Sequence, residues 1–238
     1  MTTGIILGKM FNMVAAGLAV PVLTGGACLS HVDGAEVRFC ANGVSATFNG
    51  SNELQRIVIG DAEFATGGGG LWSATFAAAT NPAEQTTVSA GDAEGFSRGE
   101  SCGVDTLFWR NIPLGGERGV LDAKVLMESR PDGSQAWRLE FENRSAKWAL
   151  FSTDFPRLSN LPGKGEVDAM LPWKDHGARL YRKWKGVKGE SSYRYLGHYP
   201  QVAAFFSGDD GLYVAAEDPD ARHKTLIVGD GEIGRAHV

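Results

Sequence analysis

Alternation of apolar and polar residues, with a period of two, is the feature that most constrains how this chain can fold. In "AEVRFCANGVSATFNG" residues 37–41 alternate in this way, and residues 44–48 repeat the pattern after the dipeptide Asn42-Gly43. Successive side chains of a strand point to opposite faces of a sheet, so this spacing predicts two strands that each bury one face. Asn-Gly is favoured in two-residue hairpin turns, and we therefore expect a β-hairpin here.

The middle of the chain carries the most regular alternation. Every second residue from Trp137 to Phe141 is apolar, and every second residue from Arg138 to Glu142 is charged. The predicted strands and the turns between them are, in chain order, residues 120–129, 131–133, 136–143, 144–146 and 148–155. We expect the three strands to form an antiparallel meander with one buried face.

Strand patterns also occupy most of the remaining chain, and no window longer than a turn or two has a convincing helical period. Further strands are predicted at "LQRIVIGDAEF", at residues 72–76 and in a hairpin around residues 208–211. The segment nearest to a helix, residues 177–186, is bounded tightly by glycine at both ends. A chain of 238 residues can bury a sizeable core. We expect an all-β fold, a large two-sheet antiparallel β-sandwich of the supersandwich kind, with few or no helices apart from the N-terminal signal segment.

Composition argues against several kinds of partner and cofactor. The chain has 23 basic and 28 acidic residues and no basic run, which disfavours duplex nucleic acid as a partner. Three cysteines without CxxC spacing do not support a zinc site, and Asp218 and Asp220 lack the full acidic pattern of a calcium loop. Gly67 to Gly70 are not followed by the Lys-Ser or Lys-Thr of a phosphate cradle. We expect no metal, no cofactor and no nucleic acid.

The N-terminal residues have the pattern of an export signal. Lys9 precedes an apolar stretch over residues 10–23 that is too short to span a bilayer comfortably. Small residues at 25–27 then provide a cleavage site, and Cys28 follows, as in bacterial lipoproteins. We expect residues 1–27 to direct export, so that the chain is secreted, periplasmic or lipid-anchored at the cell surface through Cys28. The alternative is an N-terminal extension of a cytosolic protein.

The other two cysteines leave two states open. In an oxidising compartment Cys40 and Cys102 can form a disulfide bond, with Cys28 left for lipid. Equally, both can remain free thiols. Three cysteines in a chain of this length do not imply a disulfide scaffold.

The last seven residues, "EIGRAHV", have an unusual property as a nucleotide sequence. Written back into codons, they reproduce the start of a standard short-read sequencing adapter, whose next triplet in that frame is a stop. We therefore interpret residues 232–238 as an adapter-encoded tail and exclude them from reasoning about the fold. The domain itself is expected to span residues 28–231.

The order of several short motifs carries a resemblance to a known family. These motifs are "ENRSAKWAL", "DFPRLSNLP", "DAMLPWKDHG", "YPQVAAFF" and "GLYVAAEDPDARHKTL", in that order. Together, over about residues 35–228, they resemble the β-supersandwich that precedes the catalytic barrel in certain bacterial glycoside hydrolases, a domain similar in fold to galactose mutarotase. The resemblance implies an N-terminal accessory domain that acts with carbohydrate.

The same resemblance implies where catalysis would lie. Hydrolysis in these enzymes uses two carboxylates at the ends of barrel strands, and such a barrel takes about 250 residues. We therefore expect this polypeptide to lack the catalytic barrel, to depend on it as a partner, and to have no activity and no catalytic residue of its own. The loop-rich middle holds four carboxylates that we leave without a catalytic role: Asp154, Glu166, Asp168 and Asp175.

Aromatic residues on loops are the candidates for carbohydrate contact. Trp173 has Asp175 and His176 beside it, and Tyr199 is a similar position, so each can combine a stacking surface with hydrogen-bonding groups. Alternatively, Trp173 packs at the rim of the sandwich. Two other functions stay open: an exported, non-catalytic carbohydrate-binding or adhesion sandwich, and an aldose mutarotase-like epimerase with His176 or His198 as its acid.

Overall fold

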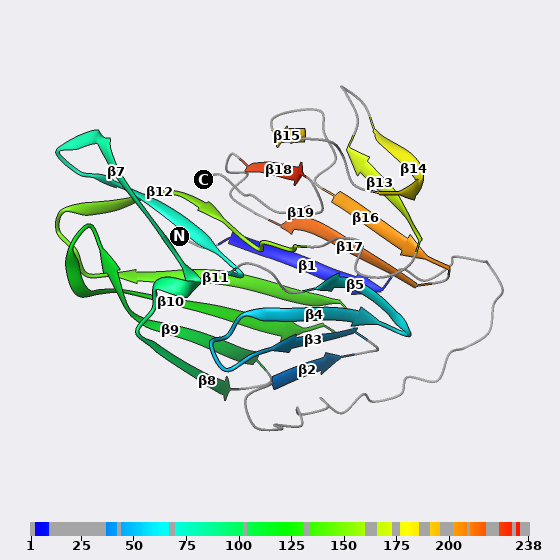
Figure 1. Ribbon diagram of the computed structural model, residues 1–238, viewed down its shortest axis with the longest axis horizontal. Coiled ribbons are helices and arrows are strands. Elements are labelled where there is room, and N and C mark those ends of the chain that lie inside the picture. Colours follow the sequence, from blue (N-terminus) through cyan, green and yellow to red (C-terminus); the bar gives the residue numbers. More distant parts are fainter. Residues whose placement is uncertain are drawn as a thin grey trace.

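The computed structural model is built almost entirely from β-strands (Figure 1). It describes residues 3–9, 37–41, 44–66, 70–101, 104–130, 134–159, 166–172, 177–185, 191–195, 202–208, 210–217, 224–229 and 232–233. Within these ranges the helical structure is one 3-10 turn, η1 (Ala90–Asp92). None of the residues so described lies in a helix that could cross a membrane.

The largest sheet has nine strands, and every neighbouring pair in it is antiparallel. Their order across the sheet is β14-β13-β16-β17-β1-β11-β10-β9-β8. The strands are β1 (Thr3–Lys9), β8 (Gly95–Ser101), β9 (Val104–Leu114), β10 (Glu117–Ser129), β11 (Gln135–Asn143), β13 (Val167–Pro172), β14 (Ala178–Trp184), β16 (Val202–Ser207) and β17 (Asp210–Glu217).

Three smaller sheets complete the fold, with the strand orders β2-β3-β4-β5, β12-β6-β7 and β15-β18-β19. Their strands are β2 (Val37–Ala41), β3 (Val44–Phe48), β4 (Leu54–Ile59), β5 (Ala62–Thr66), β6 (Ser73–Ala78), β7 (Asn81–Ser89), β12 (Trp148–Asp154), β15 (Ser191–Tyr195), β18 (Lys224–Gly229) and β19 (Glu232–Ile233). The short strand β19 falls in the segment that we interpret as an adapter-encoded tail.

Aromatic side chains join the layers into a sandwich. Phe48 of the four-stranded sheet contacts Trp137 of β11, with ring centroids 6.0 Å apart. Trp72, at the start of β6, meets Trp109 of β9 edge-on at 5.9 Å and Phe141 of β11 at 5.2 Å. Trp109, Trp137 and Phe141 lie on one face of the nine-stranded sheet. The four-stranded sheet and the sheet β12-β6-β7 therefore cover that same face. The expected all-β sandwich is confirmed.

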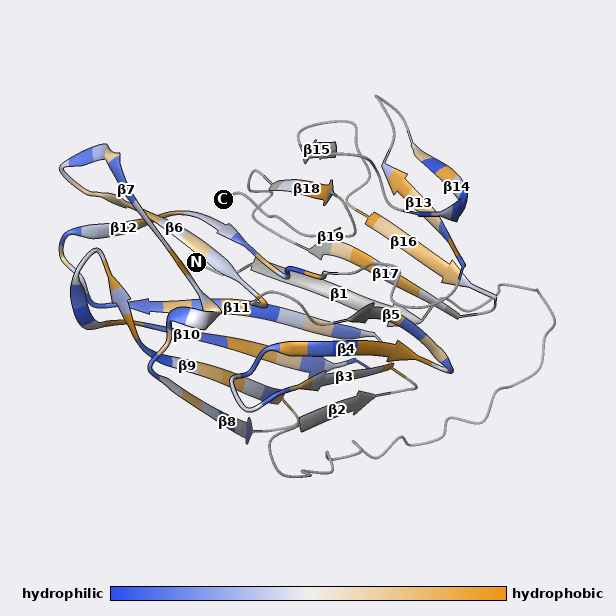
Figure 2. Cartoon of the chain, in the orientation of Figure 1, coloured by the Kyte–Doolittle hydropathy of each residue, from blue (hydrophilic) through white to orange (hydrophobic). Residues whose placement is uncertain are grey.

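The expected hairpins are present. Strands β2 and β3 pair so that Ala41 lies opposite Val44, which leaves two residues for the turn between them. Strands β16 and β17 also pair with two residues between them, and the segment closest to a helical pattern forms strand β14. Hydrophobic and hydrophilic residues alternate along β9, β10 and β11, as Figure 2 shows.

The expected three-stranded meander is wrong in its third strand. Strands β10 and β11 pair over nine residues each, but β12 leaves the nine-stranded sheet and pairs with β6. Side chains organise the corner between β11 and β12. The Ser145 amide donates to the Asn143 side chain (3.0 Å), and the Asn143 side-chain amide donates to the Trp148 carbonyl (2.7 Å). These bonds replace a hairpin ladder and bring Trp148, which is buried, into the core.

A buried asparagine links the two layers. Asn52 lies in the turn between β3 and β4 with a φ of 57°, a left-handed conformation that asparagine tolerates. Its side-chain amide donates to the carbonyls of Ser97 (3.3 Å) and Phe108 (3.0 Å), in β8 and β9. Its side-chain oxygen accepts a hydrogen bond from Arg98 (2.9 Å). The turn is therefore fixed to the nine-stranded sheet close to strand β9.

The N-terminal strand β1 lies in the middle of the nine-stranded sheet. It pairs with β11 on one side and with β17 on the other, so it joins two groups of four strands (Figure 1). Its residues belong to the segment that the sequence predicts to be an export signal.

Candidate functional site

The residues that the sequence favours for binding or modification lie almost entirely outside the described part of the chain. They are Cys28, Cys102, Trp173, Asp175, His176, His198 and Tyr199. For Cys40, the structure places the backbone in strand β2, opposite Ser45. The predictions of lipidation, of a disulfide bond and of carbohydrate contact by these residues therefore stay predictions.

Three of the four loop carboxylates are placed, and they do not form one site. Asp154 is on β12 and accepts a hydrogen bond from Ser73 (3.0 Å). Glu166 lies beside Lys183, and Asp168 of β13 is paired with Arg182 and accepts a bond from the Lys183 amide (2.9 Å). Asp175 lies outside the described residues. The three placed carboxylates thus come from two sheets, and each has a donor from the protein.

The pKa of Asp168 shows what its surroundings favour. The hydrogen bond from the Lys183 amide, and after it the bond from Arg182, hold the pKa of the Asp168 carboxyl below its usual value. A carboxylate held in its ionised form is a poor proton donor. Both bonds join Asp168 of β13 to residues of β14, so its carboxylate links the two strands of this hairpin.

A hollow of about 390 Å³ lies on the nine-stranded sheet and is lined by three consecutive residues from each of strands β9, β10 and β11. We call it the outer hollow. Its lining residues are Phe108, Trp109, Arg110, Asp122, Ala123, Lys124, Glu140, Phe141 and Glu142. The central residue of each triplet turns its side chain toward the core, and the flanking residues alternate to the other face. The hollow therefore lies on the face that the sandwich core leaves open.

One side of the outer hollow is a chain of ion pairs across β10 and β11. Lys124 lies 2.9 Å from one oxygen of Glu140, and Arg138 lies 3.0 Å from the other. Each of these pairs is partly exposed, so each adds little to stability. Their main effect is to fix the position of the Glu140 carboxylate on the sheet.

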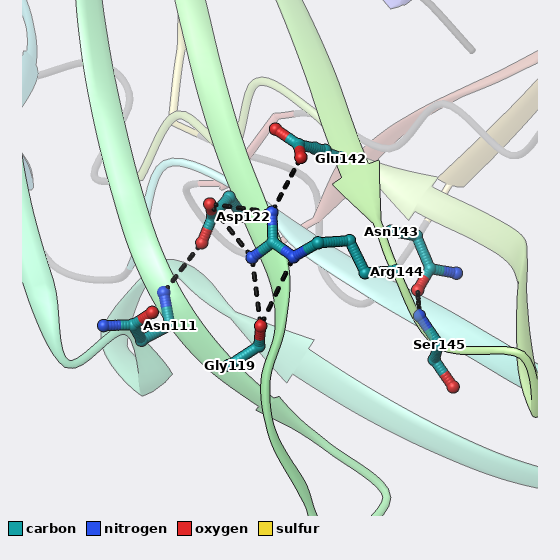
Figure 3. Close-up of polar contacts among 7 residues, drawn as sticks. All are labelled: Asn111, Gly119, Asp122, Glu142, Asn143, Arg144 and Ser145. Carbon is teal, nitrogen blue, oxygen red and sulfur yellow. Dashed lines mark hydrogen bonds and ion pairs between the residues drawn. The ribbon is translucent and has the colours of Figure 1, made fainter.

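Arg144 organises the other side, where β10 meets β11 (Figure 3). Its guanidinium donates to Glu142 (2.8 Å), lies 3.1 Å from Asp122, and donates to the carbonyl of Gly119 (3.0 Å). Asp122 also accepts a hydrogen bond from the backbone amide of Asn111 (2.8 Å). This one carboxylate, on β10, therefore links β9 to the residue that follows β11. The hydrogen bonds to Glu142 and to Asp122 raise the pKa of the Arg144 guanidinium above its usual value.

The outer hollow also has an aromatic member. Phe108, on β9, is half-buried, and the guanidinium carbon of Arg110 lies 5.0 Å from the centre of its ring. A cation at this distance over a ring is attracted by the negative face of the ring. The hollow thus combines an aromatic surface with planar hydrogen-bonding groups on three adjacent strands, which position side chains more rigidly than loops do.

A second pair of acidic residues lies where β8 pairs with β9, near the start of β9. Asp105 of β9 is directly opposite Glu100 of β8, and Asp105 also neighbours Met127, which is buried. Burial first, and then the charge of Glu100, raise the pKa of Asp105 to about 6. Two carboxylates alone do not define a binding site, but the raised pKa of Asp105 predicts that the stability of the protein depends on pH.

The outer hollow lies on strands, and the sequence-based candidates did not include its residues. Its residues are the outward positions of strand patterns, and the alternation already assigns Glu140 and Glu142 to the solvent face. What the sequence does not reveal is that β9 and β10 lie beside them. The charged outward positions of three successive strands are the signal that could have identified the hollow.

The outer hollow is suited to binding polar ligands. Carboxylates and guanidinium groups supply acceptors and donors in fixed planes, and Phe108 supplies a stacking surface. Within the described residues no cluster of three or more His, Cys, Asp or Glu side chains is arranged to hold a metal ion. A comparison with protein-family models finds no match for the chain, and a comparison with curated proteins finds none either.

Proposed function

We propose that this chain is the N-terminal accessory β-supersandwich of an exported bacterial glycoside hydrolase, and that it contacts carbohydrate through the outer hollow. The domain is galactose-mutarotase-like in this proposal, and hydrolysis belongs to a catalytic barrel elsewhere in the parent protein. The sandwich alone is therefore a binding module without turnover.

Two observations support the proposal at the level of the whole domain. The chain is an all-β sandwich with one large antiparallel sheet, which agrees with the supersandwich that the motif order resembles. The "ENRSAKW" motif also has a structural role, because Asn143, Arg144 and Ser145 build the corner at which the chain changes sheets. A motif that fixes a corner belongs to the fold and does not identify a ligand.

The observation that carries the carbohydrate assignment is the composition of the outer hollow. Sugars present hydroxyl groups in a plane and an apolar ring face, so they are bound by planar polar side chains beside an aromatic ring. The hollow has both, with Asp122, Glu140 and Glu142 as acceptors and Phe108 as the ring. All four side chains come from strands, and the carboxylates are already oriented by ion pairs.

Binding to oligosaccharides tests this assignment. We expect the full chain to bind members of an array of neutral and acidic oligosaccharides, and Phe108→Ala to weaken that binding about tenfold because the stacking surface is lost. Phe151→Ala is the matched control, since Phe151 is an exposed phenylalanine (53%) on β12, outside the outer hollow. Equal loss of binding in both variants, or no binding by the full chain, would contradict the assignment.

The functions left open by the sequence are distinguished by other measurements. An exported adhesion sandwich would use the same hollow, so binding measurements do not separate it from the hydrolase domain. The downstream reading frame does: alternating strands and helices with acidic residues at strand ends would indicate the hydrolase. An epimerase would instead accelerate the change of optical rotation of a freshly dissolved aldose. We expect no such acceleration by this chain.

A further inference from the structure

The charges around the outer hollow are not evenly matched. Three carboxylates lie there, Asp122, Glu140 and Glu142, and each has a cation within hydrogen-bonding distance. The cations that hold them are Lys124, Arg138 and Arg144. Of these three cations only Lys124 lines the hollow itself. The other cation of the lining is Arg110, and within the described residues it forms no ion pair.

Among the described residues, the Arg110 side chain contacts an aromatic ring and no acidic side chain. Its guanidinium lies over the ring of Phe108, and both residues belong to β9, two positions apart on the same face of the sheet. A guanidinium that is attracted to a ring can still donate hydrogen bonds from its N–H groups. The planar fork of an arginine matches the two oxygens of a carboxylate.

We infer that the outer hollow selects carbohydrates that carry a carboxylate, such as uronic acid units, and that Arg110 is the residue that determines this specificity. The inference rests on the proposed function, because it names the class of carbohydrate that the same hollow binds. In this arrangement the sugar ring packs against the part of Phe108 that Arg110 leaves uncovered, its carboxylate meets the Arg110 guanidinium, and its hydroxyls meet the fixed acceptors. The bound carboxylate pairs with the lining cation that forms no ion pair within the described residues.

A pair of probes that differ only in the carboxylate tests the inference. The full chain is titrated with trigalacturonate and with its fully methyl-esterified form, which has the same ring and linkage but no charge. We expect the acid to bind about tenfold more tightly than the ester at low salt, and the difference to shrink as salt is added. In Arg110→Gln the acid and the ester should bind equally.

Controls separate this inference from the proposed function. Arg182→Gln removes an exposed arginine from β14, outside the hollow, and should keep the preference for the acid. Arg110→Lys keeps the charge without the planar fork and should retain only part of it. Matching unfolding midpoints would show that all three variants fold.

Each outcome has a definite meaning. Equal binding of acid and ester by the unmodified chain overturns the inference and leaves the proposed carbohydrate binding intact. Equal weakening of both ligands in Arg110→Gln also overturns it, because Arg110 would then contribute without discriminating. If neither these probes nor any neutral oligosaccharide binds, the proposed function fails and the inference fails with it.

Discussion

At the scale of single residues, Asp105 shows how the sheet responds to pH. Burial and the neighbouring charge of Glu100 raise its pKa to about 6, from the usual 3.8. The folded chain therefore holds the Asp105 proton more tightly than the unfolded chain does. Stability from this group is fully present below about pH 4, decreases as pH rises toward 6, and is absent above that value.

Replacing this carboxyl by an amide should remove that dependence. We expect Asp105→Asn to raise the free energy of unfolding at pH 7.5 by about 1 kcal/mol, a value reduced from the full shift because Asp105 is partly exposed. Near pH 4 the two proteins should be alike, since Asp105 is then protonated. Urea unfolding between pH 4 and 8 measures this, and Glu100→Gln, which removes only the smaller cause, should give a smaller effect. Parallel curves for Asp105→Asn and the unmodified chain would contradict the expectation.

At the scale of strands and turns, the features predicted from sequence are those that depend on neighbours along the chain. The hairpin around Asn42-Gly43 and the pair β10–β11 follow from alternation and turn residues. The move of β12 to another sheet does not, because it depends on the packing of Trp148 and on the contact of β12 with β6, about 70 residues earlier.

The outer hollow also combines features that depend on neighbours along the chain with features that depend on distant strands. Alternation along β11 places Glu140 and Glu142 on the open face, and the structure confirms that orientation. The pairing of β9 with β10 and β11 brings Phe108, Arg110 and Asp122 to the same place. That pairing is a property of the sheet, so the pattern of any one strand does not predict it.

The turn between β9 and β10 offers a direct test at this scale. Gly115 and Gly116 both have positive φ, +56° and +89°, but a Cβ at Gly115 would overlap the indole of Trp148, whereas a Cβ at Gly116 would meet nothing within 4 Å. We expect Gly116→Ala to cost about 1.5 kcal/mol, for backbone strain alone. Gly115→Ala should cost about 2 kcal/mol more, because Trp148 must shift.

Urea unfolding of the two glycine variants separates backbone strain from the steric clash. Gly116→Ala is the control, since it lies in the same turn and changes the same atoms. Equal losses in the two variants would mean that Trp148 yields without cost, and that the corner before β12 is less firmly packed than the structure indicates.

At the scale of the whole molecule, the nine-stranded sheet depends on its central strand. Strand β1 pairs with β11 over five residues and with β17 over six. In the strand order β11 and β17 are separated by β1 and do not pair with each other. The strands that carry the outer hollow lie on one side of β1, and β13, β14, β16 and β17 lie on the other. A chain without β1 would expose two strand edges in the middle of the sheet.

Removing the N-terminal strand therefore tests the integrity of the whole sheet. We expect a chain that begins at Cys28, the product of the predicted signal cleavage, to lose roughly 5 kcal/mol of unfolding free energy, because backbone hydrogen bonds on both sides of β1 are lost. A peptide with the sequence of Thr3–Lys9 should restore part of that stability, and a peptide of the same residues in scrambled order should not.

This deletion also decides between two roles for the first 27 residues. If the chain that begins at Cys28 unfolds at the same urea concentration as the full chain, β1 contributes nothing to the sheet and removal of the segment on export is without structural consequence. If it is destabilised and the peptide restores it, the folded protein needs this strand, and cleavage after Ala27 would leave an open slot between β11 and β17. The intact mass of the protein recovered from an exporting host then shows whether residues 1–27 are retained.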